Sequence, residues 1–134
     1  MDWLRILGAA SAAAILASFT DWYFFGILFH DRYQTHPGVW RKYRDKKDEI
    51  RSIAWGTLLG ASSCLIFVVV CDWLGVHSVV GTLLLGLAVW ALGPFSLLLT
   101  NSLFMNMDPY LLISHSLGWL VRLVIAGLAV AVIF

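Results

Sequence analysis

Residues 112–125 read LISHSLGWLVRLVI, an apolar stretch interrupted by His115 and Arg122. This stretch belongs to an apolar run over residues 110–134, and three similar runs precede it, at residues 3–29, 52–74 and 79–104. Each run exceeds the roughly 20 residues that an α-helix needs to cross the hydrocarbon core of a bilayer. The sequence therefore predicts an all-α integral membrane protein with four transmembrane helices.

The composition agrees with a membrane environment. Of the 134 residues, 60% are hydrophobic and 13% are charged, whereas charged residues make up about 25% of a typical soluble domain. A chain of this length forms a single domain. We therefore expect residues 1–134 to form one transmembrane domain.

The three connectors between the apolar runs differ in length and charge. Short turns at residues 72–77 and 105–109 predict that the helices they join are antiparallel neighbours in a bundle. The connector at residues 30–51 holds seven of the nine lysines and arginines. By the positive-inside rule this loop is expected in the cytoplasm, and an even number of spans then places both termini on the opposite face.

The basic connector is expected to be partly helical, starting near Pro37, with i,i+4 pairs between Arg41 and Asp45 and between Arg44 and Asp48. Its basic side chains are suited to binding anionic lipid headgroups, which gives them a role without a nucleic-acid partner. The predicted headgroup anchors are Arg41, Lys42, Arg44, Lys46 and Lys47.

Four polar side chains lie within the apolar runs at related depths. At 1.5 Å of rise per residue, Asp21 lies about 12 Å and Arg122 about 18 Å from the loop side of the bilayer, with His115 at about 8 Å and Asn101 at about 5 Å. Each unpaired charge at such depth costs about 2.5–3.5 kcal/mol. Pairing of Asp21 with Arg122 is therefore expected. The pair either fixes the register of the helices or serves an ion, proton or substrate path, and Asp21 is merely interfacial if the first helix ends near Tyr23.

Small residues at helical spacing predict the contact faces of the helices. Such residues let two helix backbones approach closely in a membrane. In the third helix Gly93 and Pro94 are expected to produce a kink. The predicted packing residues are Ser11, Ala14 and Ser18 in the first helix, Gly56 and Gly60 in the second, and Gly118 in the fourth.

These features favour a small membrane protein that handles an ion, a proton or a small solute. One chain of this size can hardly enclose a pore, so this hypothesis implies a homo-oligomer. The alternative is a non-catalytic accessory subunit of a larger membrane complex, in contact with pigment or lipid. No catalytic arrangement or zinc-ligand spacing is found, and we expect no enzyme activity, metal or cofactor.

Two stretches resemble domain-of-unknown-function family seventeen sixty-one, a family of small bacterial and fungal membrane proteins. The first is a Trp-Tyr motif that ends helix one, followed by a Leu-Phe pair and a tryptophan. The second covers helix three to helix four. Together they cover about half of the chain, and the resemblance implies a four-helix fold without implying a mechanism. The matching residues are Trp22, Tyr23, Leu28, Phe29 and Trp40, then Trp90, Pro94, Asn101, Phe104, Asn106, Asp108 and His115.

Overall fold

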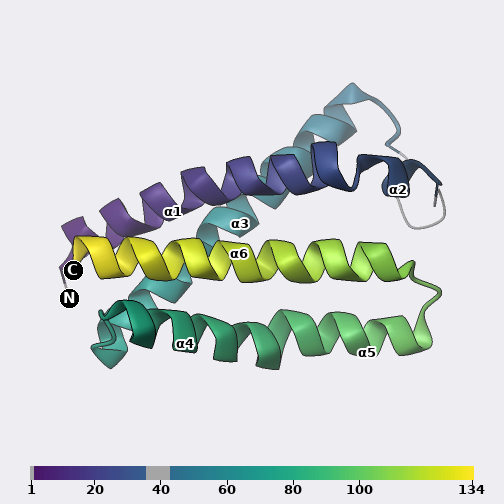
Figure 1. Cartoon of the computed structure of the whole chain (residues 1–134). Coiled ribbons are helices and arrows are strands. Elements are labelled where there is room, and N and C mark those ends of the chain that lie inside the picture. The colour runs from purple at the N-terminus through teal and green to yellow at the C-terminus, as the bar shows by residue number, and fades with distance from the viewer. Residues whose placement is uncertain (1, 36–42) are drawn as a thin grey trace.

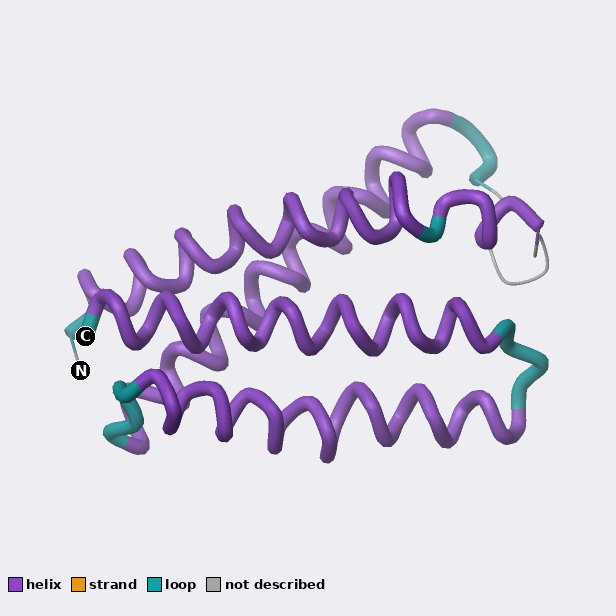
Figure 2. Tube along the Cα trace, viewed as in Figure 1, coloured by secondary structure: helices purple, strands orange, loops and turns teal. Residues whose placement is uncertain are grey.

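The computed structural model describes residues 2–35 and 43–134, which are almost entirely helical (Figure 2). Two of the helical segments, η1 and η2, are short π-helical turns within longer helices. The order along the chain is α1 (Trp3–Tyr23), η1 (Phe24–Leu28), α2 (His30–Thr35), α3 (Lys46–Leu74), α4 (Val79–Trp90), η2 (Ala91–Phe95), α5 (Ser96–Phe104) and α6 (Pro109–Ile133).

Four of the helical segments are long and apolar enough to cross a membrane. They comprise Trp3–Leu28, Lys46–Leu74, Val79–Phe104 and Pro109–Ile133. The third has the predicted bounds, and the other three differ from the prediction only at their ends. The predicted all-helical class with four such segments is thus confirmed.

The start of α3 differs from the prediction for an electrostatic reason. Asp45 caps the helix, because its carboxylate accepts a hydrogen bond of 2.8 Å from the backbone N–H of Asp48. Arg44 therefore precedes the helix, and its backbone N–H donates a 3.3 Å hydrogen bond to the Asp48 carboxylate. The two residues thus do not form the predicted i,i+4 pair within a helix, because the helix begins only at Lys46. The predictions for Pro37, Trp40, Arg41 and Lys42 lie outside the described residues.

Helix α6 is the centre of the arrangement and packs against α1, α3, α4 and α5. In Figure 1 the axes of α1, α6 and the α4–α5 segment are roughly aligned, with α6 antiparallel to the other two, whereas α3 passes obliquely behind them. Beyond the turn at Gly75, which has a left-handed φ of 65°, α3 and α4 make no extensive contact within the described chain. The two helices still touch through side chains, since the ring of Phe67 lies 3.6 Å from an ideal Cβ on Gly86, but α4 packs more closely on α6 than on α3.

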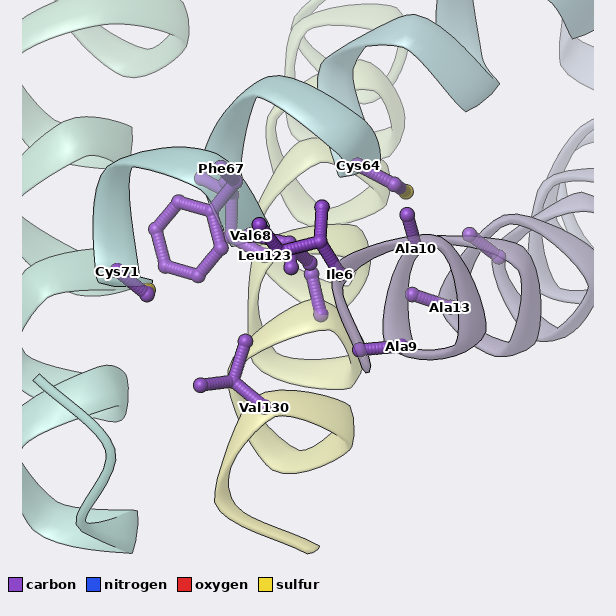
Figure 3. Packing of buried hydrophobic residues seen from close by; sticks show 12 residues of the cluster. Ile6, Ala9, Ala10, Ala13, Cys64, Phe67, Val68, Cys71, Leu123 and Val130 are labelled. Atoms are coloured by element: carbon purple, nitrogen blue, oxygen red, sulfur yellow. The ribbon is translucent and has the colours of Figure 1, made fainter. Parts of the chain in front are cut away.

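The hydrophobic core lies where α1, α3 and α6 meet (Figure 3). Helix α1 contributes mostly alanines, whose small side chains let α3 and α6 come close. Both chain termini lie at this end of the molecule, and α2 lies at the other (Figure 1). The core residues are Ile6, Ala9, Ala10, Ala13 and Ala17 from α1, Cys64, Phe67, Val68 and Cys71 from α3, and Leu123, Ala126 and Val130 from α6.

The buried face of α1 differs from the predicted stripe. Ser11 and Ser18 are exposed and Ala14 is half-buried. The α1 face that is buried carries the alanines of the core, because alanines pack more closely than serines and leave no hydroxyl in an apolar contact. The predicted packing role of Ser11 and Ser18 is therefore wrong.

The predicted glycines of α3 are not backbone contacts either. Gly56 is exposed, and a Cβ built on it meets nothing within 4 Å. Gly60 faces the guanidinium of Arg122, with 3.2 Å between its ideal Cβ and Nη2. Gly118 is buried, and its ideal Cβ would lie 3.6 Å from the ring of Phe25. Of the three predicted glycines, Gly60 and Gly118 pack against a neighbouring helical segment, and Gly56 does not.

The packing of α4 against α6 confirms that the third and fourth helices are neighbours, but the glycines at their contact were not predicted. An ideal Cβ on Gly127 would lie 3.3 Å from the backbone oxygen of Thr82. One turn away from this contact, an ideal Cβ on Gly86 of α4 would lie 3.5 Å from Leu123 of α6. The indole N–H of Trp90 donates a 2.8 Å hydrogen bond to the backbone oxygen of Ser116, which joins the two helices again.

Gly93 and Pro94 lie in the π-helical turn η2. Proline has no N–H to donate and its ring crowds the preceding turn, so the helix widens at this point. The segments α4 and α5 nevertheless continue in roughly the same direction (Figure 1). The interruption expected at these two residues is therefore a local widening of the helix.

Candidate functional site

The structure brings Asp21 of α1 and Arg122 of α6 into direct contact. Nη2 of Arg122 donates a hydrogen bond to a carboxylate oxygen of Asp21, which forms an ion pair between residues far apart in the sequence. The side chains are 25% and 13% exposed, respectively. The contact has one donor and one acceptor, unlike the two parallel bonds of a fork-like arginine–carboxylate pair.

Arg122 has two further neighbours that the sequence analysis did not identify. Its Nη1 lies 3.5 Å from the hydroxyl oxygen of Ser63, and that hydroxyl donates its own proton to the backbone oxygen of Gly60 at 2.7 Å. The guanidinium carbon lies 4.8 Å from the ring centroid of Trp119, a cation–π distance. Three elements therefore hold this guanidinium: α1, α3 and α6 itself.

The ion pair lies in an open cleft of about 560 Å³ between α1 and α3. The core residues of α1 end at Ala17 and those of α3 begin at Cys64, and the cleft lies on the loop side of them. Its walls combine apolar side chains with the two charges and a few hydroxyl groups. The lining residues are Ala14, Ala17, Ser18, Asp21, Trp22, Phe25, Gly26, His30, Ile53, Gly56, Thr57, Gly60 and Arg122.

The cleft extends from the ion pair toward the loop end of the molecule. It reaches the exposed His30 of α2 in that direction. In the other direction it ends at Ala14, Ala17 and Gly60, and the next residues toward the termini, Ala13 and Cys64, are 0% and 1% exposed. The site is therefore open on one side of the ion pair and closed by the core on the other.

The other two residues of the predicted polar cluster lie elsewhere. His115 is half-buried beside the cleft, where its ring lies 4.9 Å from the ring of Phe25. Asn101 lies on α5, which packs against α6 and makes no extensive contact with α1 within the described chain. The structure therefore brings together Asp21 and Arg122, with His115 nearby, and separates Asn101 from them.

The predicted lipid-headgroup anchors lie outside this site. Lys46 and Lys47 are exposed in the first turn of α3, and Arg44 is exposed just before it. Together these three exposed side chains give the loop end of α3 a basic surface. Arg41 and Lys42 lie outside the described residues.

Ser63 and Trp119 were not predicted to contact Arg122, because the sequence carries only a weak signal for them. Ser63 follows Gly60 by three positions, so both lie on one face of α3. Trp119 precedes Arg122 by three positions on α6. A serine and a tryptophan in an apolar helix are common, however, and no pattern in the chain links them to an arginine on the basis of sequence alone.

Comparisons with known proteins identify no relative of this chain. No family model matches it. No curated protein and no solved structure is significantly similar to it. The resemblance to family seventeen sixty-one therefore stays a prediction from the motifs.

Proposed function

We propose that the protein is a multi-pass membrane protein that passes protons, or a small ion or solute, through the cleft between α1 and α3. The observation that carries this proposal is the Asp21–Arg122 pair, placed at the closed end of an open cleft. Ionisable groups inside membrane helices most often belong to ion, proton or substrate paths. A pair that only fixed helix register would not need a cleft beside it.

The orientation and assembly are part of the same proposal. The loop at residues 30–51 lies in the cytoplasm because of its seven basic residues, so the cleft opens toward the cytoplasm. Both termini then lie on the face opposite to the cytoplasm, so a reporter enzyme that works only outside the cytoplasm should be active when it is fused to either terminus.

The protein works as a homo-oligomer, since one copy forms a cleft closed at one end. Native mass spectrometry after mild extraction tests this assembly, and a monomer would contradict it.

A second candidate function is that of an accessory subunit in a larger complex. The observation in its favour is the α4–α5 segment, which packs on α6 and leaves large apolar side chains exposed, among them Leu92, Leu103 and Phe104. Lipid covers such a surface equally well in a membrane. The cleft therefore favours the first candidate.

Proton flux in liposomes tests the proposed function. Purified protein is reconstituted with a pH-sensitive dye inside, and a potassium gradient with an ionophore drives protons inward. We expect flux above that of empty liposomes, and we expect Asp21→Asn to lower it by about tenfold or more, because the amide cannot exchange a proton. Glu49→Gln removes an exposed carboxylate at the start of α3 and serves as the control that keeps its flux. Wild-type flux equal to that of empty liposomes, or equal to that of Asp21→Asn, would contradict the proposal.

A further inference from the structure

Arg122 uses few of its hydrogen-bond donors. A guanidinium has five N–H groups and no acceptor. Within the described chain, one N–H of Arg122 bonds to Asp21, a second lies 3.5 Å from Ser63, and the buried Nε has no partner. Unpaired donors in an apolar environment cost free energy. The site is therefore short of acceptor oxygens around Arg122.

The walls of the cleft fit a ligand with an apolar body. Trp22, Phe25 and Ile53 line it between the ion pair and the loop end. Its volume of about 560 Å³ falls within the range of about 300–1,000 Å³ for sites that bind small molecules. A ligand entering from the loop end would place its far end against Arg122. Acceptor oxygens at that end would meet the part of the Arg122 guanidinium that lines the cleft.

The charges of the cleft set a condition on such a ligand. Asp21 and Arg122 together are neutral, so an added anion alone would leave one uncompensated negative charge in an apolar cleft, which is unfavourable. A proton on Asp21 removes this obstacle and also frees Arg122 from its present partner. We propose that the cleft binds a small organic anion with an apolar body, a carboxylate or sulfonate, together with one proton. This inference rests on the proposed function and names the solute that travels with the proton.

The exchange is balanced in charge and atoms. A proton from water at the loop end binds a carboxylate oxygen of Asp21, and the ion pair with Arg122 separates. The oxygens of the organic anion then accept the hydrogen bonds of Arg122. The cleft holds one negative and one positive charge before the exchange and after it, and no covalent bond forms besides the O–H bond on Asp21.

Few other titratable groups face Asp21. Helix α6 presents Arg122 and His115, and α2 presents His30 at the mouth of the cleft. Helix α3 presents the thiol of Cys64 and, among the described lining residues, no acid or base. Among the described residues, Asp21 thus carries the only carboxylate that lines the cleft.

Thermal unfolding of the protein in lipid nanodiscs tests the inference, with benzenesulfonate as the probe. This anion stays ionised throughout the pH range used, so any pH dependence of its binding comes from the protein. Benzenesulfonamide is the neutral control of the same shape. We expect benzenesulfonate to raise the unfolding temperature and benzenesulfonamide to leave it unchanged. Because one proton is taken up with each anion, the apparent affinity is expected to be higher at about pH 6 than at about pH 8.

Two variants separate the roles of the pair. Asp21→Asn imitates the protonated carboxyl group, so it should bind benzenesulfonate with the same affinity at about pH 6 and about pH 8. The double variant Asp21→Asn, Arg122→Gln removes both charges and avoids an unpaired buried charge. It should fold and show no response to benzenesulfonate.

Each outcome decides between the proposals. No stabilisation of the wild type, equal affinity of the wild type at both pH values, or a response in the double variant would overturn the inference. Proton flux that depends on Asp21 without benzenesulfonate binding would leave the proposed function in place and remove only the organic anion. Binding with the expected pH dependence, but without proton flux even when benzenesulfonate is added to the liposomes, would instead contradict the proposed function.

Discussion

Arg122 shows how a charged side chain is accommodated in an apolar helix. An isolated charge near the centre of a membrane-spanning helix would cost about 2.5–3.5 kcal/mol, whereas Asp21, Ser63 and Trp119 surround the charge of Arg122. The depth of the two charges along their helices was enough to predict the pairing of Asp21 with Arg122. Ser63 and Trp119 could not be predicted, because neutral residues carry no comparable free-energy cost that demands a partner.

Gly60 gives a test at the scale of one residue. Gly60→Ala would place a Cβ about 3.2 Å from Nη2 of Arg122, so the guanidinium would have to shift by a few tenths of an ångström beside Asp21. Gly56→Ala is the matched control, one turn earlier on the same helix, with nothing within 4 Å of its Cβ. We expect Gly60→Ala to be less stable than Gly56→Ala by about 1 kcal/mol in chemical unfolding in detergent micelles.

Two results would contradict this expectation. Equal stability of the two alanine variants would show that the guanidinium does not lie against Gly60. A lower stability of Gly56→Ala would show that the face of α3 lining the cleft is in fact packed against another helix.

At the scale of helices, contact faces were harder to predict than the helices themselves. Continuous apolar runs fixed the existence and approximate bounds of the four long segments. In α1, however, small residues occur on several faces, so spacing alone could not distinguish the stripe with Ser11 and Ser18 from the stripe with Ala13 and Ala17. The buried stripe is the one without hydroxyl groups, which depends on what α3 and α6 offer opposite to it.

The α4–α6 contact gives a test at the same scale. Gly127→Ala would place a Cβ 3.3 Å from the backbone oxygen and Cβ of Thr82, and a backbone cannot yield as a flexible side chain can. We expect a loss of about 1–3 kcal/mol, typical of overpacking. Gly93→Ala meets nothing within 4 Å and is the control. A Gly127→Ala variant as stable as Gly93→Ala in the same unfolding experiment would mean that α4 does not pack closely on α6.

At the scale of the whole molecule, α6 holds the other long helices together and leaves a cleft at one end. The sequence predicted four helices in a bundle, but a symmetrical bundle would place α3 beside α4. The structure instead gathers α1, α3 and α6 around the core near the termini, so α1 and α3 leave a cleft toward the loop end. The cleft could not be predicted, because it depends on how obliquely α3 crosses its neighbours.

The central claim is that Asp21 and Arg122 depend on each other within the folded molecule. A double-mutant cycle measures this dependence directly, with the free energies of unfolding in bicelles of the wild type, Asp21→Asn, Arg122→Met and the double variant. We expect Asp21→Asn to be less stable than the double variant, because it leaves a buried charge without a partner. The expected interaction energy is about 1–3 kcal/mol. The account would be contradicted if the effects of the two single variants sum to the effect of the double variant within about 0.5 kcal/mol.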